Sequence, residues 1–126
     1  MTRRVITTTG APTAIGPYSQ GIDAGSLVFV AGQIGRDPES GELPDGIEAQ
    51  TERAMKNIAA ILDAVGLAWA DVVKTTCFLA EITDFDAFNG VYKRFVVDPP
   101  PARSTFAVKD LPRSARVEIE AIAARG

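Results

Sequence analysis

Apolar residues in the middle of the chain recur at intervals of three and four, which is the spacing of one face of a helix. The positions are Ile47, Thr51, Ala54, Met55, Ile58, Ile61, Leu62 and Val65. Before them, Asp45 and Glu48 have the spacing of a capping box, and after them Gly66 stands where a glycine often ends a helix. The pattern therefore predicts an amphipathic helix between Asp45 and Gly66.

A second apolar stripe predicts a shorter helix later in the chain. It begins at Thr83 or Asp84, and its apolar side consists of Phe85, Phe88, Val91, Tyr92 and Phe95. The triple proline at 99–101 cannot continue this helix.

Runs of β-branched and apolar residues separated by turn residues predict strands. We place them at residues 5–8, 20–24, 27–31, 71–79, 103–108 and 115–123, with a hairpin turn at 24–26 and a loop at 37–46.

The strand predicted at 115–123 carries two carboxylates on one face. With a period of two, Val117, Ile119, Ala121 and Ala123 point one way, and Arg116, Glu118, Glu120 and Ile122 point the other way. Burying carboxylates in the middle of an apolar strand costs free energy unless they are paired with a cation or serve a function. We therefore expect function on the face with Glu118 and Glu120.

The two predicted helices cover only one face of the sheet, because right-handed crossovers place both on the same side. The strand at 27–31 is apolar throughout, which predicts that it is buried on both faces. Val72, Phe78 and Ile122 add apolar surface to the uncovered face. Large exposed apolar patches usually mark interfaces. We therefore expect an oligomer built sheet to sheet, with the two glutamates at or near the subunit contact.

Composition narrows the class of protein. The 126 residues suit one domain, and a hydrophobic share of 46% with 23% charged residues argues against disorder. The net charge of −3 argues against nucleic acid as a partner. No run approaches the ~20 apolar residues of a membrane span, and residues 1–10 lack the apolar core of a signal peptide. We expect a single domain over residues 1–126, located in the cytoplasm, with no membrane partner.

The residue types that are absent narrow the chemistry. The chain has no histidine, which excludes His-based triads and most zinc sites. Gly10, Gly16 and Gly21 are too widely spaced for a phosphate-binding loop. Cys77 is the only cysteine, so we expect a small core residue and no intrachain disulfide. Catalysis must then come from carboxylates, arginine, tyrosine, hydroxyls and backbone amides.

Four segments, in order along nearly the whole chain, match motifs of one known family. They are AIGPYSQG at 14–21, AGQI at 31–34, DVVKTT at 71–76, and a tail that runs from PARS at 101–104 through VEIEA at 117–121. A lone Pro-Ala-Arg would have little specificity, whereas the four segments together are specific. The chain resembles the RidA/YjgF family of reactive-intermediate deaminases.

This resemblance implies an α+β fold similar to Bacillus chorismate mutase, with a mixed six-stranded sheet and two helices on one face. In that topology the final strand inserts into the middle of the sheet. The connection at 109–114, with Pro112 inside it, is long enough for the last strand to skip its predecessor. The resemblance further implies a homotrimer with a substrate cleft at each subunit interface.

The resemblance also implies an activity. Family members hydrolyse 2-imino acids, released by pyridoxal-phosphate-dependent dehydratases, to 2-keto acids and ammonia, and they use no metal or cofactor. Arg103 would bind the substrate carboxylate, which a planar guanidinium matches bidentately, and Glu118 would position or activate water. The resemblance places the remaining substrate contacts at Tyr18, Asn89, Gly32 and Thr105.

Two positions depart from common versions of the family. Ala31 stands where many members have serine, which removes one hydrogen bond to substrate and bears on the preferred imino acid. Thr105 stands where many have cysteine, but the expected contact runs through its backbone N–H. Structural alternatives also stay open, because Arg103 could form a surface or intersubunit ion pair and Glu118 could pair with Arg116.

Three other functions stay open at this point. A non-catalytic trimer that senses small carboxylates through Arg103 would have no need of Glu118. Some relatives are described as translation inhibitors or ribonucleases, a role that fits poorly with an acidic chain without histidine. A neighbouring deaminase specificity, for example toward an aminomuconate-like substrate, is the third.

Overall fold

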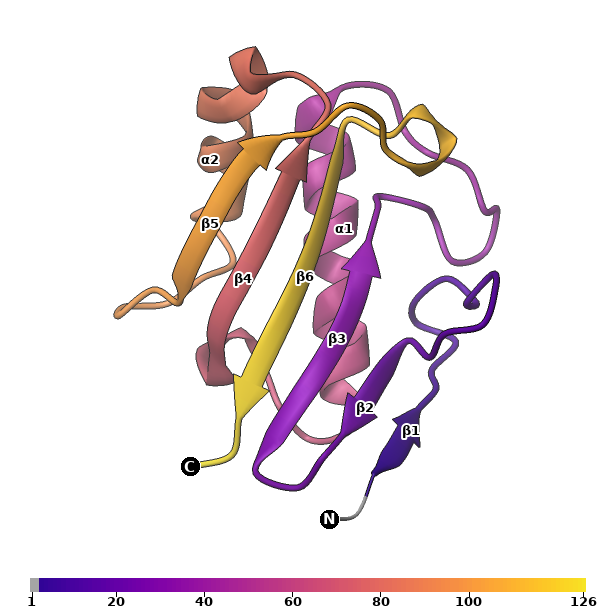
Figure 1. Ribbon diagram of the computed structural model, residues 1–126, viewed down its shortest axis with the longest axis vertical. Helices are drawn as coiled ribbons and strands as arrows, with labels where there is room; N and C mark the ends of the chain where they lie inside the picture. Colours follow the sequence, from indigo (N-terminus) through magenta and orange to yellow (C-terminus); the bar gives the residue numbers. More distant parts are fainter. Residues whose placement is uncertain (1–2) are drawn as a thin grey trace.

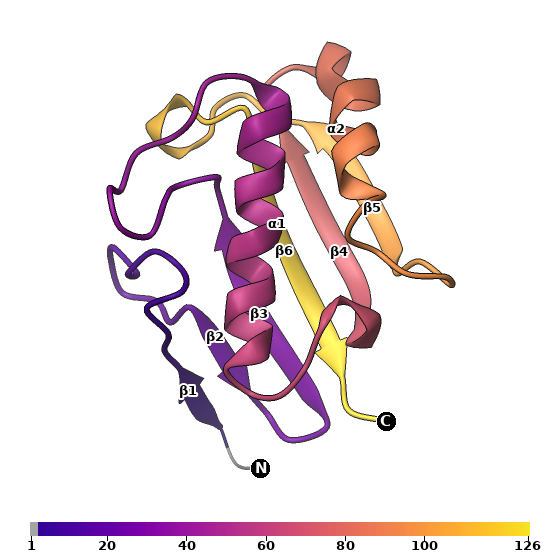
Figure 2. The ribbon, with the colours of Figure 1, turned by 180° about the vertical axis from the view of Figure 1, so that it is seen from behind.

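Six strands form one mixed sheet, and both helices lie on one of its faces (Figures 1 and 2). The computed structural model describes residues 3–126. The strands are β1 (Arg4–Ile6), β2 (Gly21–Asp23), β3 (Leu27–Gln33), β4 (Val72–Leu79), β5 (Ala102–Ala107) and β6 (Val117–Ala124). The helices are α1 (Ile47–Asp63) and α2 (Phe85–Tyr92), with 3-10 turns η1 (Trp69–Asp71), η2 (Ile82–Asp84) and η3 (Pro112–Ser114). The α+β architecture expected from the resemblance is confirmed.

The last strand in chain order lies in the middle of the sheet. The spatial order is β1-β2-β3-β6-β4-β5, and β6 is antiparallel to both of its neighbours, whereas β4 and β5 are parallel (Figure 1). The segment between β5 and β6 therefore crosses over β4, as its length allowed. This insertion brings the two glutamates of β6 to the centre of the sheet face that the helices leave open.

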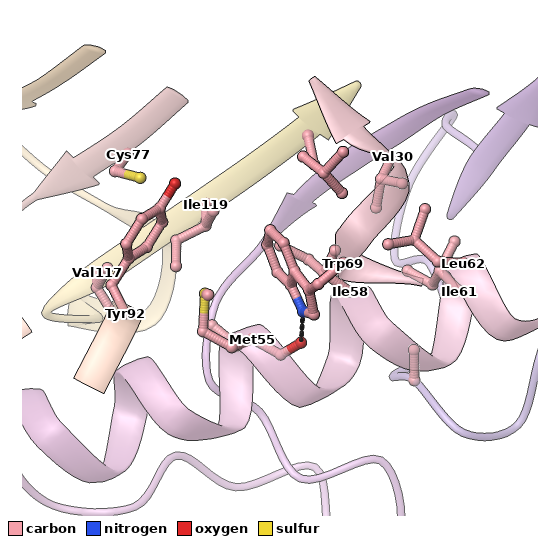
Figure 3. Close-up of a cluster of buried hydrophobic side chains, with 14 of the residues drawn as sticks. Val30, Met55, Ile58, Ile61, Leu62, Trp69, Cys77, Tyr92, Val117 and Ile119 are labelled. Atoms are coloured by element: carbon pink, nitrogen blue, oxygen red, sulfur yellow. Dashed lines mark hydrogen bonds between the residues drawn. The ribbon is translucent and has the colours of Figure 1, made fainter. Parts of the chain in front are cut away.

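The core lies between the helices and the sheet (Figure 3). The predicted stripe of α1 is buried except for the partly buried Val65, and it packs on the inward row of β6, whose residues are Val117, Ile119, Ala121 and Ala123. Trp69 closes one end, and its indole N–H donates to the carbonyl oxygen of Met55 at 3.3 Å. Cys77 is fully buried, as expected of a core residue. The alternation predicted for β6 is therefore confirmed.

The start of α1 differs from the predicted capping box. Gly46 occupies the N-cap position with φ of 90°, and no side chain caps the helix. Asp45 lies one residue too early, and a glycine has no side-chain oxygen with which to bond the first free N–H groups. Glu48 still lies in the first turn, where it complements the helix dipole. The other end agrees with the prediction, because Gly66 adopts φ of 76° just beyond the helix.

Two predictions about the open face are wrong for the single chain. β3 is not buried on both faces: Val28 and Val30 are buried, but Leu27 and Phe29 are 39% and 41% exposed. Val72 lies in the core rather than on the open face, because a register shift between Val72 and Lys74 reverses the alternation there. Val73 is exposed in its place.

Element bounds otherwise differ from prediction by a few residues. β1 covers Arg4–Ile6 rather than 5–8, β3 continues to Gln33 rather than ending at residue 31, and β6 runs to Ala124. The hairpin turn at 24–26 is present, with the Ala24 N–H donating to the Leu27 carbonyl. Within residues 3–126, no helix has both the length and the apolar character that a membrane span requires.

Candidate active site

A β-bulge in β3 lies beside the glutamates of β6. Val30 pairs with Ala121 and Gln33 pairs with Ile119, so residues 31–32 of β3 stand opposite Glu120 alone. An extra residue in one strand bends it and re-aims the neighbouring backbone and side chains, and such bulges are common next to active sites. The bulge explains why this strand, rather than another, forms a wall of the candidate site.

Gly32, the second residue of the bulge, makes room for the side chain of Glu118. A Cβ atom at position 32 would lie 2.1 Å from Glu118 Oε2 and 3.0 Å from its Cδ. Separations of this size are far inside van der Waals contact, so the carboxylate lies directly on the backbone of the bulge. Only glycine at position 32 is compatible with this place for the carboxylate.

Glu118 is half-buried and has no ion-pair partner among residues 3–126. Burial raises the pKa of its carboxyl, and the nearby charge of Glu120 raises it further. The expected alternative of a pair with Arg116 is wrong, because Arg116 donates to Asp84 Oδ2 from Nε at 3.0 Å and from Nη2 at 2.7 Å. No other cation among residues 3–126 forms an ion pair with Glu118. A carboxylate in this condition is a candidate general base.

A groove with a volume of about 610 Å³ runs over this carboxylate. Its lining includes Tyr18, Ala31, Gly32, Arg36, Arg113, Glu118 and Glu120. The Tyr18 hydroxyl accepts the backbone N–H of Ile15 at 3.3 Å, which leaves its own O–H available as a donor. Below we call this cavity the Glu118 groove. The structure therefore brings three predicted site residues, Tyr18, Gly32 and Glu118, together in one place.

Arg103 belongs to a second cluster, at the edge of the sheet beneath α2. Its Nη1 donates to Asn89 Oδ1 at 2.8 Å, and its Cζ lies 4.7 Å from the centre of the Tyr92 ring. The rings of Phe85 and Phe88 lie 5.7 and 5.5 Å from the same carbon. Aromatic faces attract a guanidinium and restrict its rotation. Asn89 and the aromatic side of α2 therefore fix the plane in which Arg103 can present its other N–H groups.

Thr105 follows Arg103 on the same side of β5. Its hydroxyl is buried and, among residues 3–126, is the one buried side-chain polar atom that lacks a hydrogen-bond partner. Across the strand pair it lies in register with Cys77. Burial raises the pKa of the Cys77 thiol to about 11, so this cysteine is not a nucleophile.

The two clusters face opposite sides of the sheet. Arg103 is in register with the fully buried Thr75, whose side chain points toward the helices. Glu118 is in register with Phe78, which lies an odd number of residues along β4 from Thr75. Phe78 and Glu118 therefore point to the open side of the sheet. One chain therefore does not bring Arg103 and Glu118 into a common cavity. A site that uses both needs a second chain.

Several lining residues carried no signal in the sequence. Arg36 lies in a loop rich in proline and glycine, and Arg113 follows a Leu-Pro pair. Both reach the Glu118 groove only through the tertiary fold. Among the residues that the structure describes, no group of three or more acidic or cysteine side chains is arranged to hold a metal ion.

The comparisons with known proteins agree with this architecture. The family model described as Endoribonuclease L-PSP matches residues 8–125. The mouse protein named 2-iminobutanoate/2-iminopropanoate deaminase is 47% identical, with 98% of this chain and 93% of that protein covered. The Salmonella typhimurium protein of the same name is 43% identical, with 97% and 98% covered.

Solved structures give the same result in three dimensions. The crystal structure of E. coli TdcF with bound serine superposes with a TM-score of 0.94 at 42% identity, with 98% of this chain and 99% of that chain covered. That of the E. coli YjgF gene product gives a TM-score of 0.93 at 41% identity, with the same coverage. Sequence identity over nearly the full length, a close structural superposition and a family model that spans nearly the whole sequence lead to one conclusion: the chain belongs to the RidA/YjgF family.

Proposed function

We propose that this protein hydrolyses reactive 2-imino acids, including 2-iminobutanoate and 2-iminopropanoate, to 2-keto acids and ammonia. The observation that carries the proposal is the Glu118 carboxylate, which is half-buried on the backbone of Gly32 without an ion-pair partner among residues 3–126. Full-length relatives at 43–47% identity are named for this reaction, which supports it. The cytoplasmic location and the single-domain organisation remain predictions.

The active unit is a homotrimer in which each cleft uses two chains. The open sheet face exposes Leu27, Phe29 and Phe106, so it offers apolar surface for burial against another subunit. Arg103 and Glu118 lie on opposite sides of the sheet within one chain, so the Arg103 cluster of one subunit would face the Glu118 groove of the next. The number three comes from the family resemblance.

In the proposed cleft, Arg103 binds the substrate carboxylate through the N–H groups that Asn89 leaves free. Glu118 accepts a proton from water as the water oxygen bonds to the imine carbon, whose C=N electrons move to nitrogen. The resulting carbinolamine then loses ammonia, with protons returned to the nitrogen, and a C=O bond forms. The balance is one imino acid and one water to one keto acid and one ammonia.

The other predicted contacts complete this arrangement. Tyr18 supplies a hydroxyl donor at the wall of the groove, and the backbone near Gly32 borders the carboxylate of Glu118. The backbone N–H of Thr105 would contact the substrate carboxylate beside Arg103. Because an iminium carbon is already electrophilic, the protein would accelerate the reaction mainly by orienting the substrate and holding a water molecule beside it.

The family model's description also raises RNA cleavage as an activity. The net charge of −3 and the absence of histidine give no support for an RNA-binding surface or a His-based ribonuclease site. Binding of small carboxylates without catalysis would use Arg103 in the same way and leave Glu118 without a role. The half-buried carboxylate therefore favours the deaminase over both.

Ammonia release from freshly generated 2-iminobutanoate tests the activity, and subunit mixing tests the shared cleft. Arg103→Ala and Glu118→Gln subunits, each expected to be nearly inactive alone, should regain part of the parental rate when they are unfolded together and refolded as mixtures. Each mixed trimer would contain an interface at which both residues are intact. A parent that never exceeds the solvent rate would overturn the activity, and mixtures that stay inactive would overturn the shared cleft.

A further inference from the structure

Two arginines without an assigned role line the Glu118 groove. Arg36 donates from Nε to the carbonyl oxygen of Gly41 at 3.2 Å, and Arg113 donates from Nη1 to the same oxygen at 3.3 Å. Both side chains line the groove. Two guanidinium groups from segments 77 positions apart in the sequence therefore converge on one carbonyl, which we call the arginine pair.

The backbone holds Arg36 in place. Asn57 of α1 is fully buried, and its Nδ2 donates to the carbonyl oxygen of Arg36 at 2.9 Å and to that of Ile34 at 3.3 Å. Gly35 between them packs so closely on α1 that an added Cβ would lie 2.4 Å from the carbonyl oxygen of Gln50. The longest helix thus positions the segment that carries Arg36.

The backbone of η3 directs Arg113 in a different way. Arg113 and the following Ser114 have φ values of 57° and 54°, in the left-handed region that residues other than glycine seldom adopt. This turn lies beside the loop at 37–46, at the same end of the sheet in both views (Figures 1 and 2). The backbone of Arg113 and Ser114 therefore adopts an unfavourable conformation where it places the second cation at the groove.

The arginine pair carries positive charge that no ion pair within residues 3–126 neutralises. Neither guanidinium has a carboxylate within 4 Å among residues 3–126. Both arginines line the same groove as Glu118, whose pKa is raised by burial and by the charge of Glu120. Two adjacent cations without a counter-ion attract an anion, and guanidinium groups match a carboxylate in shape and charge.

We propose that Arg36 and Arg113 bind a second acidic group at the far end of the substrate, so that the preferred 2-imino acids carry a side-chain carboxylate. The inference rests on the proposed function, because it assigns the near end of the substrate to Arg103 and Glu118. With the α-carboxylate at Arg103 and the imine carbon over Glu118, the substrate side chain would extend within the groove that the arginine pair lines. A dicarboxylic imino acid would then contact a cation at each end.

Stable keto acids test this without turnover. We would measure binding of 2-oxoglutarate, with its side-chain carboxylate, and of 2-oxobutanoate, without one, by calorimetry. The parent should bind the dicarboxylate more tightly, and Arg36→Gln with Arg113→Gln should lower the ratio of the two affinities about tenfold to a hundredfold, as expected for a charged hydrogen bond. Arg4→Gln, which removes an exposed arginine of β1 at the edge strand, is the matched control and should leave the ratio unchanged.

The outcomes separate this inference from the proposed function. Equal affinity of the parent for both acids, or a ratio unchanged in the double variant, overturns the role of the arginine pair even if 2-iminobutanoate is deaminated. A ratio that falls while the parent releases no ammonia from any imino acid supports the arginine pair and overturns the deaminase. Arg36→Lys, which keeps the charge, should retain part of the preference. An equal loss in Arg4→Gln would overturn the assignment by showing a general charge effect.

Discussion

The carboxylate of Glu118 and the backbone of Gly32 occupy adjoining space, such that a Cβ atom on residue 32 would lie 2.1 Å from Oε2. The glycine belongs to a bulge in β3 and the glutamate to β6, so two strands jointly determine where the proposed base lies. Neither backbone segment can shift alone without breaking the pairing on its other side. The sheet therefore determines the geometry of the proposed base.

Gly32→Ala should remove activity while the protein stays folded. Gly32 has no positive φ, so alanine can adopt its backbone conformation, but the added methyl group must displace the Glu118 carboxylate. We expect kcat to fall by roughly the 10²–10⁴-fold of a lost general base. Gly90→Ala, in an exposed and open position of α2, is the control and should keep its activity. Normal turnover by Gly32→Ala would show that the carboxylate need not lie on the bulge.

Glu118→Gln should slow turnover by a similar ~10²–10⁴-fold, because glutamine keeps the shape of the side chain but cannot accept the proton. Binding of 2-oxobutanoate, which depends chiefly on Arg103, should change far less. Single-turnover kinetics and calorimetry on the same preparation separate the two effects. Parental rates in this variant would show that Glu118 is not the base.

The pH dependence should be set by Glu118 and adjusted by Glu120. Burial and the charge of Glu120 both raise the pKa of Glu118, so the base form is lost, and activity falls, as the pH drops through a value above the usual range of glutamate. Glu120→Gln removes the repulsion and should lower that pKa. The acidic limb of kcat against pH should then move to lower pH, and a limb that stays in place would assign the titration to another group.

Asn89→Ala should weaken substrate binding more than it slows chemistry. The side chain accepts a 2.8 Å hydrogen bond from Arg103, so its loss frees the guanidinium to rotate over the rings of α2. We expect KM to rise on the order of tenfold with a smaller change in kcat. Asn89→Asp keeps the acceptor and should restore most of the affinity. A change confined to kcat would contradict an orienting role.

Stability at low pH should depend on Asp23. Two hydrogen bonds from Arg125, at 2.8 and 2.9 Å, and one from the Gly25 N–H lower the pKa of Asp23 from 3.8 to about 2. Because the folded pKa is depressed, the stabilisation is complete above about pH 4 and is lost as the pH falls through 2. Asp23→Asn should lower the thermal midpoint at pH 7, and this difference should shrink between pH 4 and 2. A constant difference would exclude the ion pair as its source.

Patterns that repeat along the chain predicted most of the fold. The stripe of α1 and the alternation of β6 reflect periodic burial, and the burial of Cys77 followed from its type. The error at Val72 arose because a register shift between strands is a tertiary feature that reverses alternation without changing composition. The apolar run of β3 predicted burial on both faces, yet one chain covers only one of them.

Site residues were predicted where a motif named them and missed where only the fold assembles them. Tyr18, Gly32 and Glu118 came from the resemblance and meet in one groove. Arg36 and Arg113 lie far apart in sequence, and no spacing rule connects them with Glu118. The contact between Asn89 and Arg103 was also not foreseen, because it depends on where α2 lies on β5.

The central position of β6 bears on how the protein emerges from the ribosome. Without β6, the strands β1, β2 and β3 share no ladder with β4 and β5, although all of these have already been synthesised. In a nascent chain that ends before residue 117, the strands therefore form two separate groups, and β3 and β4 each have an unpaired edge. Unpaired strand edges favour aggregation. Because Glu118 and the inward apolar row lie together on β6, pairing of β6 closes the core and completes the glutamate side of the proposed cleft in the same step.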